Sequence, residues 1–440
     1  MLGRDTRQTR RRLLNPKLLL LLSLIGPGII AANADNDASG IYGYSLAGVQ
    51  YEYGMLWVLV LVTISLGVCQ EMGARMGAVT GKGLADLIRE EYGVKVTFFA
   101  MIVLLIANYA TTVSEFAGIT AAVQIFAPPH YRSLISWCVV TLVAGGIWLL
   151  VTRGNYKRVE RILLYASLIY LAYIVSAFMA HPPWGEVMQQ MAWPHLKGIR
   201  LDHVYIFAVI NVIGTTITPW GQFYIQSTVR DKGIRADEYP YTRLDVLFGA
   251  FFTNFIAFFI IVACGKTLFQ AGLDPTIAAN KFNDAGQIAL ALRPVAGSLA
   301  AVLFAIGLFN ASCFGAITVP LSTSYAITES LGSESGLGRR AREAPMFVGV
   351  FSFIIFFSAL TVLALGNRPE YLAALILLPN IVGAALLPII LVLSLRLINN
   401  KRLMGDKING PVLNVIAWAT AVILIILSLI LLVYNLLPGH

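Results

Sequence analysis

Charged residues are scarce in this sequence. Only 12% of its 440 residues are Asp, Glu, Lys or Arg, whereas 58% are hydrophobic. Soluble domains usually carry about twice that charged share. Apolar runs recur along the whole chain, and many reach the roughly 20 residues that a helix needs to cross a bilayer. The composition excludes a soluble domain and predicts a single all-α integral membrane protein.

Cysteine and histidine are also rare, and neither is placed to hold a metal or to carry protons. The four cysteines show no Cys-x-x-Cys spacing and lie in apolar runs, where small buried hydrophobic residues are expected. None of the five histidines lies deep in such a run. The sequence therefore argues against a zinc site and a histidine proton relay. No catalytic constellation is present, so we expect neither an enzyme nor a bound cofactor.

About 11 transmembrane helices are expected from the apolar runs. The connections between them are too short to form soluble cores of their own. The expected spans cover roughly residues 18–48, 54–79, 94–127, 133–151, 160–180, 203–228, 242–265, 296–324, 345–365, 370–396 and 411–437.

The distribution of Lys and Arg predicts the orientation of these spans. The basic N-terminal segment 1–17 and every second connection together hold 25 of the 32 basic residues. Cytoplasmic loops carry such an excess, so we expect a cytoplasmic N-terminus and an external C-terminus. Topology also explains the net charge of +9, and nucleic acid is not expected as a partner. We expect a monomer in the lipid bilayer of a bacterial inner membrane.

The first span contains two acids in its middle. Asp35 and Asp37 follow an almost unbroken apolar run, and Gly26-Pro27-Gly28 and Ser39-Gly40 flank them with helix-breaking residues. A charge inside a bilayer costs at least about 2.5–3.5 kcal/mol, so it faces a protein cavity or binds something. Backbone freed from a helix at membrane depth persists only inside protein or beside water. The pattern predicts a broken helix with a cation-binding site.

The sixth span repeats this anomaly. Gly214, Pro219 and Gly221 lie in the middle of an apolar run, and Pro219 removes an amide donor from the helix. Interrupted helices in positions one and six are typical of an inverted repeat of 5+5 helices, whose two breaks meet at the substrate site. The repeats would cover about 18–180 and 203–396, with a cytoplasmic loop and the eleventh helix in 397–440.

Several motifs resemble one transporter family. Gly26-Pro-Gly-Ile-Ile-Ala-Ala-Asn-Ala-Asp-Asn-Asp37 is similar to the first helix of the natural resistance-associated macrophage protein (NRAMP) transporters, whose motif is GPxxxAAxAxxDPGN. Further matches are Ala78-Val-Thr-Gly-Lys-Gly-Leu-Ala-Asp86 and Lys401-Arg-Leu-Met-Gly-Asp406. The resemblance covers essentially the whole chain. It implies the broken-helix inverted-repeat fold and divalent metal transport, with Asp37 as the acid of the motif.

The sequence departs from the family pattern at the positions that the family uses for metal and protons. Gly40 stands where the family has an asparagine ligand, and Thr218 where it has a methionine ligand. Trp220 replaces the histidine linked to proton movement. In the third span Glu115 keeps one acid of the family pattern, but Gly118 replaces the second. These departures resemble the NRAMP-related magnesium transporters, a divergent branch.

The altered ligand positions favour a hard ion. A thioether selects soft transition metals, whereas oxygen ligands suit magnesium and manganese. Loss of two side chains should also enlarge the site, and Mg²⁺ usually keeps several of its waters. The predicted metal residues are Asp37, the carbonyl of Thr215 and the hydroxyl of Thr218, with Asp35 and Asn33 as further candidates.

Five other residues are candidates for the cavity or the ion pathway: Gly40, Glu71, Glu115, Trp220 and Gln222. Glu71 also lies four residues before Arg75, so a structural ion pair on one helix face is an alternative. Glu115 could equally be structural, and Gln222 could simply pack between helices.

The sequence thus predicts an importer of divalent metal ions, with largely hydrated Mg²⁺ as the main substrate and Mn²⁺ tolerated. The membrane potential would suffice as the driving force, because a divalent ion gains about 4.6 kcal/mol per 100 mV. A proton-coupled manganese or iron importer is the first alternative. A sodium-coupled organic-solute symporter on the same scaffold is the second, although two acids at the site repel a substrate carboxylate.

Overall fold

The computed structural model describes residues 27–154, 156–193, 203–281, 293–334, 336, 342–365 and 369–436. These residues are almost entirely helical, which confirms the all-α class. In chain order the helices are α3 (Pro27–Ala34), α4 (Ala38–Tyr51), α5 (Leu56–Thr80), α6 (Leu84–Gln124), η2 (Pro129–Tyr131), α7 (Arg132–Arg153), α8 (Tyr156–Ser167), η3 (Leu168–Tyr170), α9 (Leu171–Met179), α10 (Trp184–Ala192), α11 (His203–Thr216), α12 (Pro219–Asp231), α13 (Tyr239–Leu268), α14 (Pro275–Lys281), α16 (Arg293–Ser330), α17 (Pro345–Leu365), α18 (Pro369–Ile398), α19 (Lys401–Met404), η4 (Gly405–Lys407) and α20 (Pro411–Leu436).

Within the described residues, eight helical segments are long and apolar enough to cross a membrane. The first and fifth expected spans are divided into shorter helices, and the tenth contributes the shorter apolar stretch Leu386–Ile398. Each expected span contains helical residues in its described part, and residues 18–26 of the first lie outside the described residues. The number 11 stays a prediction. The boundaries of the two repeats also stay predictions.

Both predicted breaks are present. Asp35, Asn36 and Asp37 separate α3 from α4, and Ile217 and Thr218 separate α11 from α12. Asp37 caps α4, because its carboxylate accepts from the backbone amide of Gly40 at 2.7 Å. Pro219 occupies the first turn of α12, where its missing amide hydrogen is tolerated, while it prevents α11 from continuing.

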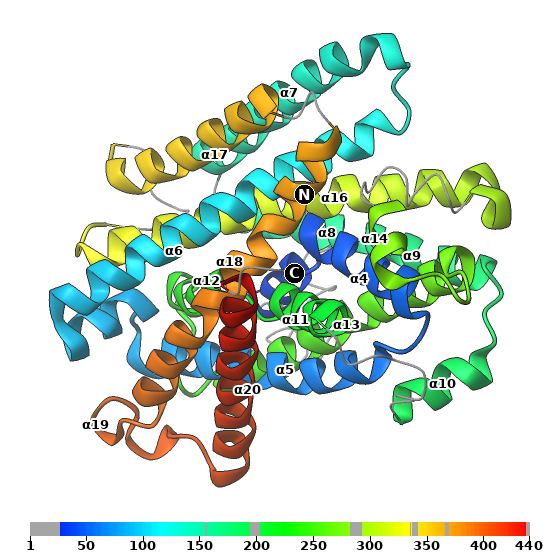
Figure 1. Ribbon diagram of the computed structural model, residues 1–440. Helices are drawn as coiled ribbons and strands as arrows, with labels where there is room; N and C mark the ends of the chain where they lie inside the picture. Colours follow the sequence, from blue (N-terminus) through cyan, green and yellow to red (C-terminus); the bar gives the residue numbers. More distant parts are fainter. Residues whose placement is uncertain are drawn as a thin grey trace, which may run out of the picture.

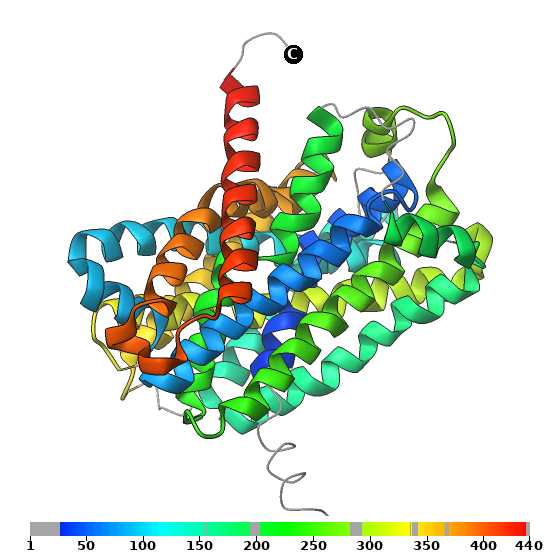
Figure 2. The ribbon, with the colours of Figure 1, turned by 90° about the horizontal axis from the view of Figure 1, so that it is seen from below.

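The broken helices lie at the centre of the bundle. α3 and α4 pack against α13, α12 packs against α5 and α16, and α6 packs along α16. α7 and α17 lie together at one edge of the bundle, and α20 stands beside α18 at another (Figures 1 and 2). All residues of α4 from Ala38 to Val49 are buried. The breaks are therefore enclosed by protein, as their polar backbone requires.

The outer helices expose apolar side chains. Leu142 on α7, Phe353 on α17 and Val415 on α20 are 73%, 55% and 69% exposed, which suits contact with lipid tails. Cys138 is exposed on the same outer helix α7 and Cys313 is half-buried, so the expectation that all four cysteines are buried is confirmed only for Cys69 and Cys264. A cysteine can face lipid because it is a small, weakly polar residue.

Helix α6 approaches the first break closely at Gly118. A Cβ atom on this residue would lie 2.5 Å from the Cβ of Ala38 and 2.3 Å from the hydroxyl of Ser312. The position where the family pattern has a second acid is thus a contact between α6, α4 and α16, with no room for a side chain.

We expect Gly118→Ala to destabilise the protein, because the added methyl group overpacks a close helix contact, at a cost of about 1–3 kcal/mol. The measurement is thermal unfolding of the purified protein in detergent. Gly145→Ala on α7 is the matched control, since a Cβ atom at Gly145 would have no described neighbour within 4 Å; it should be neutral or slightly stabilising. Equal unfolding temperatures for the two variants would contradict the close contact.

Candidate functional site

Asp37 is the acid of the first break that faces the cavity between the helices. It is 1% exposed, and it accepts hydrogen bonds from the hydroxyl of Ser39 at 2.8 Å and the amide of Gly40 at 2.7 Å. The hydroxyls of Ser39 and Thr215 lie 3.5 Å apart, which brings the second break next to the first. The positive end of α4 and these donors stabilise a carboxylate here.

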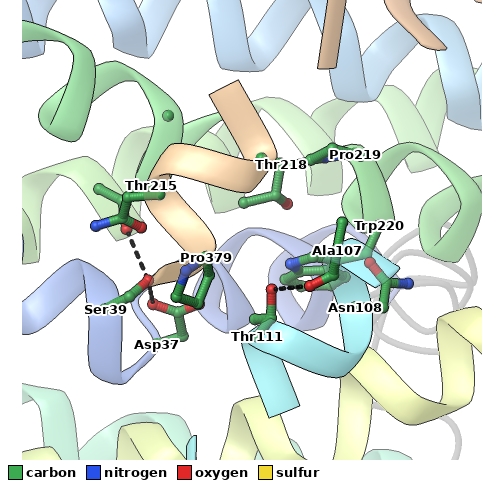
Figure 3. A pocket seen from close by; sticks show the side chains of 13 residues that line it. Asp37, Ser39, Ala107, Asn108, Thr111, Thr215, Thr218, Pro219, Trp220 and Pro379 are labelled. Carbon is green, nitrogen blue, oxygen red and sulfur yellow. Dashed lines mark hydrogen bonds between the residues drawn. The ribbon is translucent and has the colours of Figure 1, made fainter. Parts of the chain in front are cut away.

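A small cavity lies between the two breaks and the helices α6 and α18. In Figure 3, Asp37, Ser39 and Thr215 lie on one side of it and Asn108 and Thr111 on the other. The cavity has a volume of about 10 Å³, which is room for one water molecule. The lining residues are Asp37, Ser39, Ala107, Asn108, Thr111, Gly214, Thr215, Thr218, Pro219, Trp220, Pro379, Asn380 and Gly383.

The lining offers oxygen atoms to a cation. Its described side-chain groups are one carboxylate, two amides, several hydroxyls and an indole, and these residues include no cysteine, methionine or histidine. Among the described histidines, His130 lies in the short helix η2, His181 lies in a connection and His203 is the first residue of α11, so none lies deep within a helical span. Oxygen donors of this kind suit hard cations.

Asp35 has a different position from Asp37. Its carboxylate accepts from the hydroxyl of Thr218 at 3.0 Å and from the side-chain amide of Gln70 at 2.8 Å, and it does not line the cavity. These bonds join the first break to the second break and to α5. The two acids are therefore not equivalent: one faces the cavity and the other connects three helices.

Glu115 lies behind the first break. One of its carboxylate oxygens accepts from the backbone amide of Ala38 at 3.1 Å, directly after Asp37 in the chain. Its carboxylate packs against Gly315 of α16, where a Cβ atom would come within 2.4 Å. The side chain is fully buried but does not line the cavity.

Glu71 forms the ion pair that its spacing to Arg75 predicts, at 3.1 Å. It also accepts from the hydroxyl of Tyr239, and the Arg75 guanidinium donates to the carbonyls of Lys407 and Ile408 at 3.1 and 3.0 Å. The pair thus connects α5 to α13 and to the segment before α20. It lies outside the residues that line the cavity.

The site around Gly40 is tighter than the sequence suggests. A Cβ atom there would lie 3.0 Å from the carbonyl of Asp35 and 3.1 Å from the hydroxyl of Thr215. The expectation of extra room at this position is therefore wrong in this conformation, because the second break fills the space.

The remaining predicted residues have separate positions. Trp220 lines the cavity and is buried, and its carbonyl accepts from the hydroxyl of Ser322 at 2.7 Å. Gln222 lies two residues further along α12, is buried facing Gly73 of α5, and does not line the cavity. Asn33 belongs to α3, but its side chain lies outside the described part of the structure.

Sequence reasoning missed the contributions of two other helices. Asn108 and Thr111 of α6 and Pro379 of α18 line the cavity, together with Asn380 of α18, which the sequence marks as a polar candidate within its span. The available signal was their polarity or helix-breaking character inside apolar spans, since buried polar groups in membrane helices tend to be functional. Their approach to Asp37 is a tertiary contact that no local pattern reveals.

Comparisons with known proteins agree with this arrangement. A family model described as "Natural resistance-associated macrophage protein-like" matches residues 28–434. The divalent metal cation transporter MntH of Klebsiella pneumoniae is 26% identical over 423 residues, covering 94% of this chain and 95% of the relative. MntH of Erwinia tasmaniensis is 27% identical over 314 residues, covering 70% of each chain.

Solved structures show the same fold. Crystal structures of the Eremococcus coleocola manganese transporter, one of a mutant and one with an aromatic bis-isothiourea substituted compound, superpose with TM-scores of 0.75 and 0.74. Both are 20% identical in sequence. The first match covers 94% of this chain and 86% of the other, and the second covers 95% and 87%.

We expect Thr218→Val to destabilise the protein, because it removes a donor from the buried Asp35 carboxylate at a cost of about 1–3 kcal/mol. Thr218→Ser should restore the hydrogen bond. The matched control is Thr120→Val on α6, whose buried hydroxyl donates to the Phe116 carbonyl of its own helix. Thermal unfolding in detergent compares the variants. If Thr218→Val unfolds no earlier than Thr120→Val, the connecting role of Asp35 is refuted.

Proposed function

The chain belongs to the natural resistance-associated macrophage protein family, and since that makes it a divalent metal cation transporter, we propose that its main substrate is Mg²⁺, with Mn²⁺ tolerated and no obligatory coupling to protons. Members of the family are transporters and not enzymes, in agreement with the sequence. The observation that carries the choice of ion is the cavity lining, whose described residues offer Asp37 together with amide and hydroxyl oxygens but no sulfur.

The oxygen lining removes a preference for soft ions. Thr218 contributes a hydroxyl where the family pattern has a thioether, so no described lining residue selects a soft ion such as Cd²⁺ over a harder one. Asp37 supplies the charge, and the carbonyls freed at the two breaks, including that of Thr215, supply further oxygens. Mg²⁺ dehydrates reluctantly and suits a site with few direct ligands.

Two of the titratable residues that the family pattern uses for proton movement are absent from this sequence. Trp220 and Gly118 carry no titratable group where the family pattern has a histidine and an acid. Among the buried acids near the breaks, Asp35 accepts from Thr218 and Gln70, and Glu115 accepts from the amide of Ala38 through one oxygen, while its other oxygen has no hydrogen-bond partner among the described residues. The membrane potential alone supplies about 4.6 kcal/mol per 100 mV for a divalent ion.

Transport requires the cavity to open, because a hydrated ion needs more space than one water molecule. Towards the end of α12, Arg230 pairs with Asp86 of α6 at 3.3 Å and with Glu329 of α16 at 3.2 Å. The distribution of basic residues favours a cytoplasmic location for this end. Release of the ion inward then involves separation of these ion pairs as α12 moves.

The same reasoning supports the location. The bacterial relatives and the Lys and Arg distribution favour a bacterial inner membrane with a cytoplasmic N-terminus. A proton-coupled manganese importer is the competing function, favoured by the names of the relatives and by the buried Glu115. A sodium-coupled symporter of organic solutes is disfavoured, since the described cavity is small and carries a carboxylate.

The decisive experiment is Mg²⁺ uptake into proteoliposomes with the internal pH recorded at the same time. We expect uptake to follow an imposed membrane potential and to change little with a pH gradient. Acidification of the lumen that tracks metal entry under a voltage clamp would instead establish proton symport. Uptake of Mn²⁺ without Mg²⁺ would overturn the choice of ion.

Asp37→Asn is the control for this experiment. Asparagine also caps helices, so the variant keeps an acceptor for the Gly40 amide and should fold. It removes the charge opposite the cation, and we expect uptake to fall below about a tenth of the parental rate. A variant within twofold of the parent would show that Asp37 is not the principal charge at the site.

We expect Thr218→Met to shift the preference from Mg²⁺ towards Cd²⁺, because it restores a soft ligand beside Asp37. The measurement is competition between the two ions during uptake by the variant and its parent. Gly40→Asn would be a poorer test, since its Cβ atom would crowd the carbonyl of Asp35. An unchanged ratio in an active variant would show that position 218 does not set selectivity.

A further inference from the structure

One side of the cavity presents an amide oxygen that has no partner among the described residues. Asn108 of α6 is completely buried and lines the cavity, and its Oδ1 atom accepts no hydrogen bond from them. Its Nδ2 atom donates to the hydroxyl of Thr323 on α16 at 2.8 Å. Buried polar atoms nearly always find partners, so an unpaired one beside a cavity calls for a ligand or a water.

The neighbouring helix fixes which end of the amide faces the cavity. The Thr323 hydroxyl donates its single hydrogen to the carbonyl of Val319 at 3.0 Å. Towards Asn108 it can therefore only accept, and only the NH₂ end of the amide can donate to it. A flipped amide would place two acceptors against each other. The oxygen of Asn108 is held towards the cavity by this contact.

Other hydroxyl groups of the lining also donate their hydrogens to acceptors of the protein. Thr111 donates to the carbonyl of Ala107 at 3.0 Å, Thr218 donates to Asp35 at 3.0 Å, and Ser39 donates to Asp37 at 2.8 Å. Towards a ligand in the cavity these hydroxyl groups can therefore only accept hydrogen bonds. Trp220 is the exception, because its indole N–H has no acceptor within the described part of the chain.

A lining rich in acceptors complements a ligand that presents hydrogens. A bare cation takes oxygens directly, whereas a cation that keeps its waters presents the water hydrogens to the surrounding acceptors. The cavity has room for about one water molecule. Asn108 lies across this space from Asp37 and Ser39 (Figure 3), so once the cavity opens to admit the ion, a water on the ion can reach Asn108 while the ion stays beside the carboxylate.

We propose that Asn108 is a specificity-determining residue that accepts a hydrogen bond, through Oδ1, from a water molecule still coordinated to the transported ion. The substrate class is thus a partly hydrated divalent cation. The inference rests on the proposed magnesium transport. Mg²⁺ holds its waters more firmly than Mn²⁺ or Cd²⁺, so an acceptor for a coordinated water favours Mg²⁺ over these ions.

The test is Asn108→Leu, which keeps the size of the side chain but removes the acceptor. Proteoliposome uptake gives KM and the maximal rate for Mg²⁺ and for Cd²⁺. We expect the KM for Mg²⁺ to rise about tenfold, as for one hydrogen bond of about 1.4 kcal/mol, with a smaller change for Cd²⁺. Asn254→Leu on α13 is the matched control, because its buried Oδ1 also lacks a described partner but does not line the cavity.

A second probe reports on hydration directly. Hexaamminecobalt(III) carries six ammines that it cannot lose and that donate hydrogen bonds as metal-bound waters do. It should inhibit uptake by the parent competitively and inhibit Asn108→Leu at least fivefold more weakly. The inhibition is measured on uptake of whichever divalent ion the parent transports. It therefore tests the role of Asn108 even if the parent does not transport Mg²⁺.

Thr323→Val keeps the inference testable if Asn108→Leu does not fold. It frees the amide to turn its NH₂ end to the cavity, so the preference for Mg²⁺ and the inhibition should weaken in the same direction. Equal Mg²⁺ to Cd²⁺ ratios and equal inhibition in the parent, the Asn254→Leu control and the variant would overturn the role of Asn108. Magnesium transport by the parent would stand in that case.

Discussion

A carboxylate inside an apolar bundle needs hydrogen-bond donors, and this requirement shapes the centre of the protein. The first helix stops at Ala34 and restarts at Ala38, and the amide of Gly40 and the hydroxyl of Ser39 then bind the Asp37 carboxylate. Asp35 takes its donors from Thr218 and Gln70, on the second broken helix and on α5. The hydrogen bond from Thr218 that stabilises the buried Asp35 carboxylate therefore also holds the two breaks against each other.

Close packing around the breaks follows from that arrangement. Gly118 of α6 and Gly315 of α16 approach Ala38 and Glu115 so closely that neither position has space for a methyl group. α4 is buried from Ala38 to Val49, and α12 is buried from Pro219 to Val229. The cavity is small because these helices touch, so the proposed binding of a hydrated ion would require the helices around the breaks to separate.

The sequence predicted the breaks because they depend on local chemistry: Gly and Pro end helices, and acids in a span require polar surroundings. It could not distinguish Asp35 from Asp37, because the direction of each carboxylate depends on how the chain leaves α3 and which helix lies beside it. The room expected at Gly40 was wrong for a similar reason, since Thr215 comes from 175 positions further along the chain and fills it. Asn108 was missed because its hydrogen-bond partner Thr323 and its neighbour Asp37 lie on other helices.

The charge balance of the site bears on its selectivity. In the proposed site Asp37 offers one negative charge to a divalent ion, whereas the carboxylate of Asp35 accepts from Thr218 and Gln70 and does not line the cavity. A single carboxylate cannot replace the hydration of Mg²⁺, which prefers to keep several waters. The remaining lining compensates through acceptors that those waters can reach, and hydrogen bonds through water are nearly as favourable as direct ones. A thioether would favour an ion that loses water, whereas Thr218 offers only a hydroxyl, which agrees with the proposed preference for an ion that keeps its water.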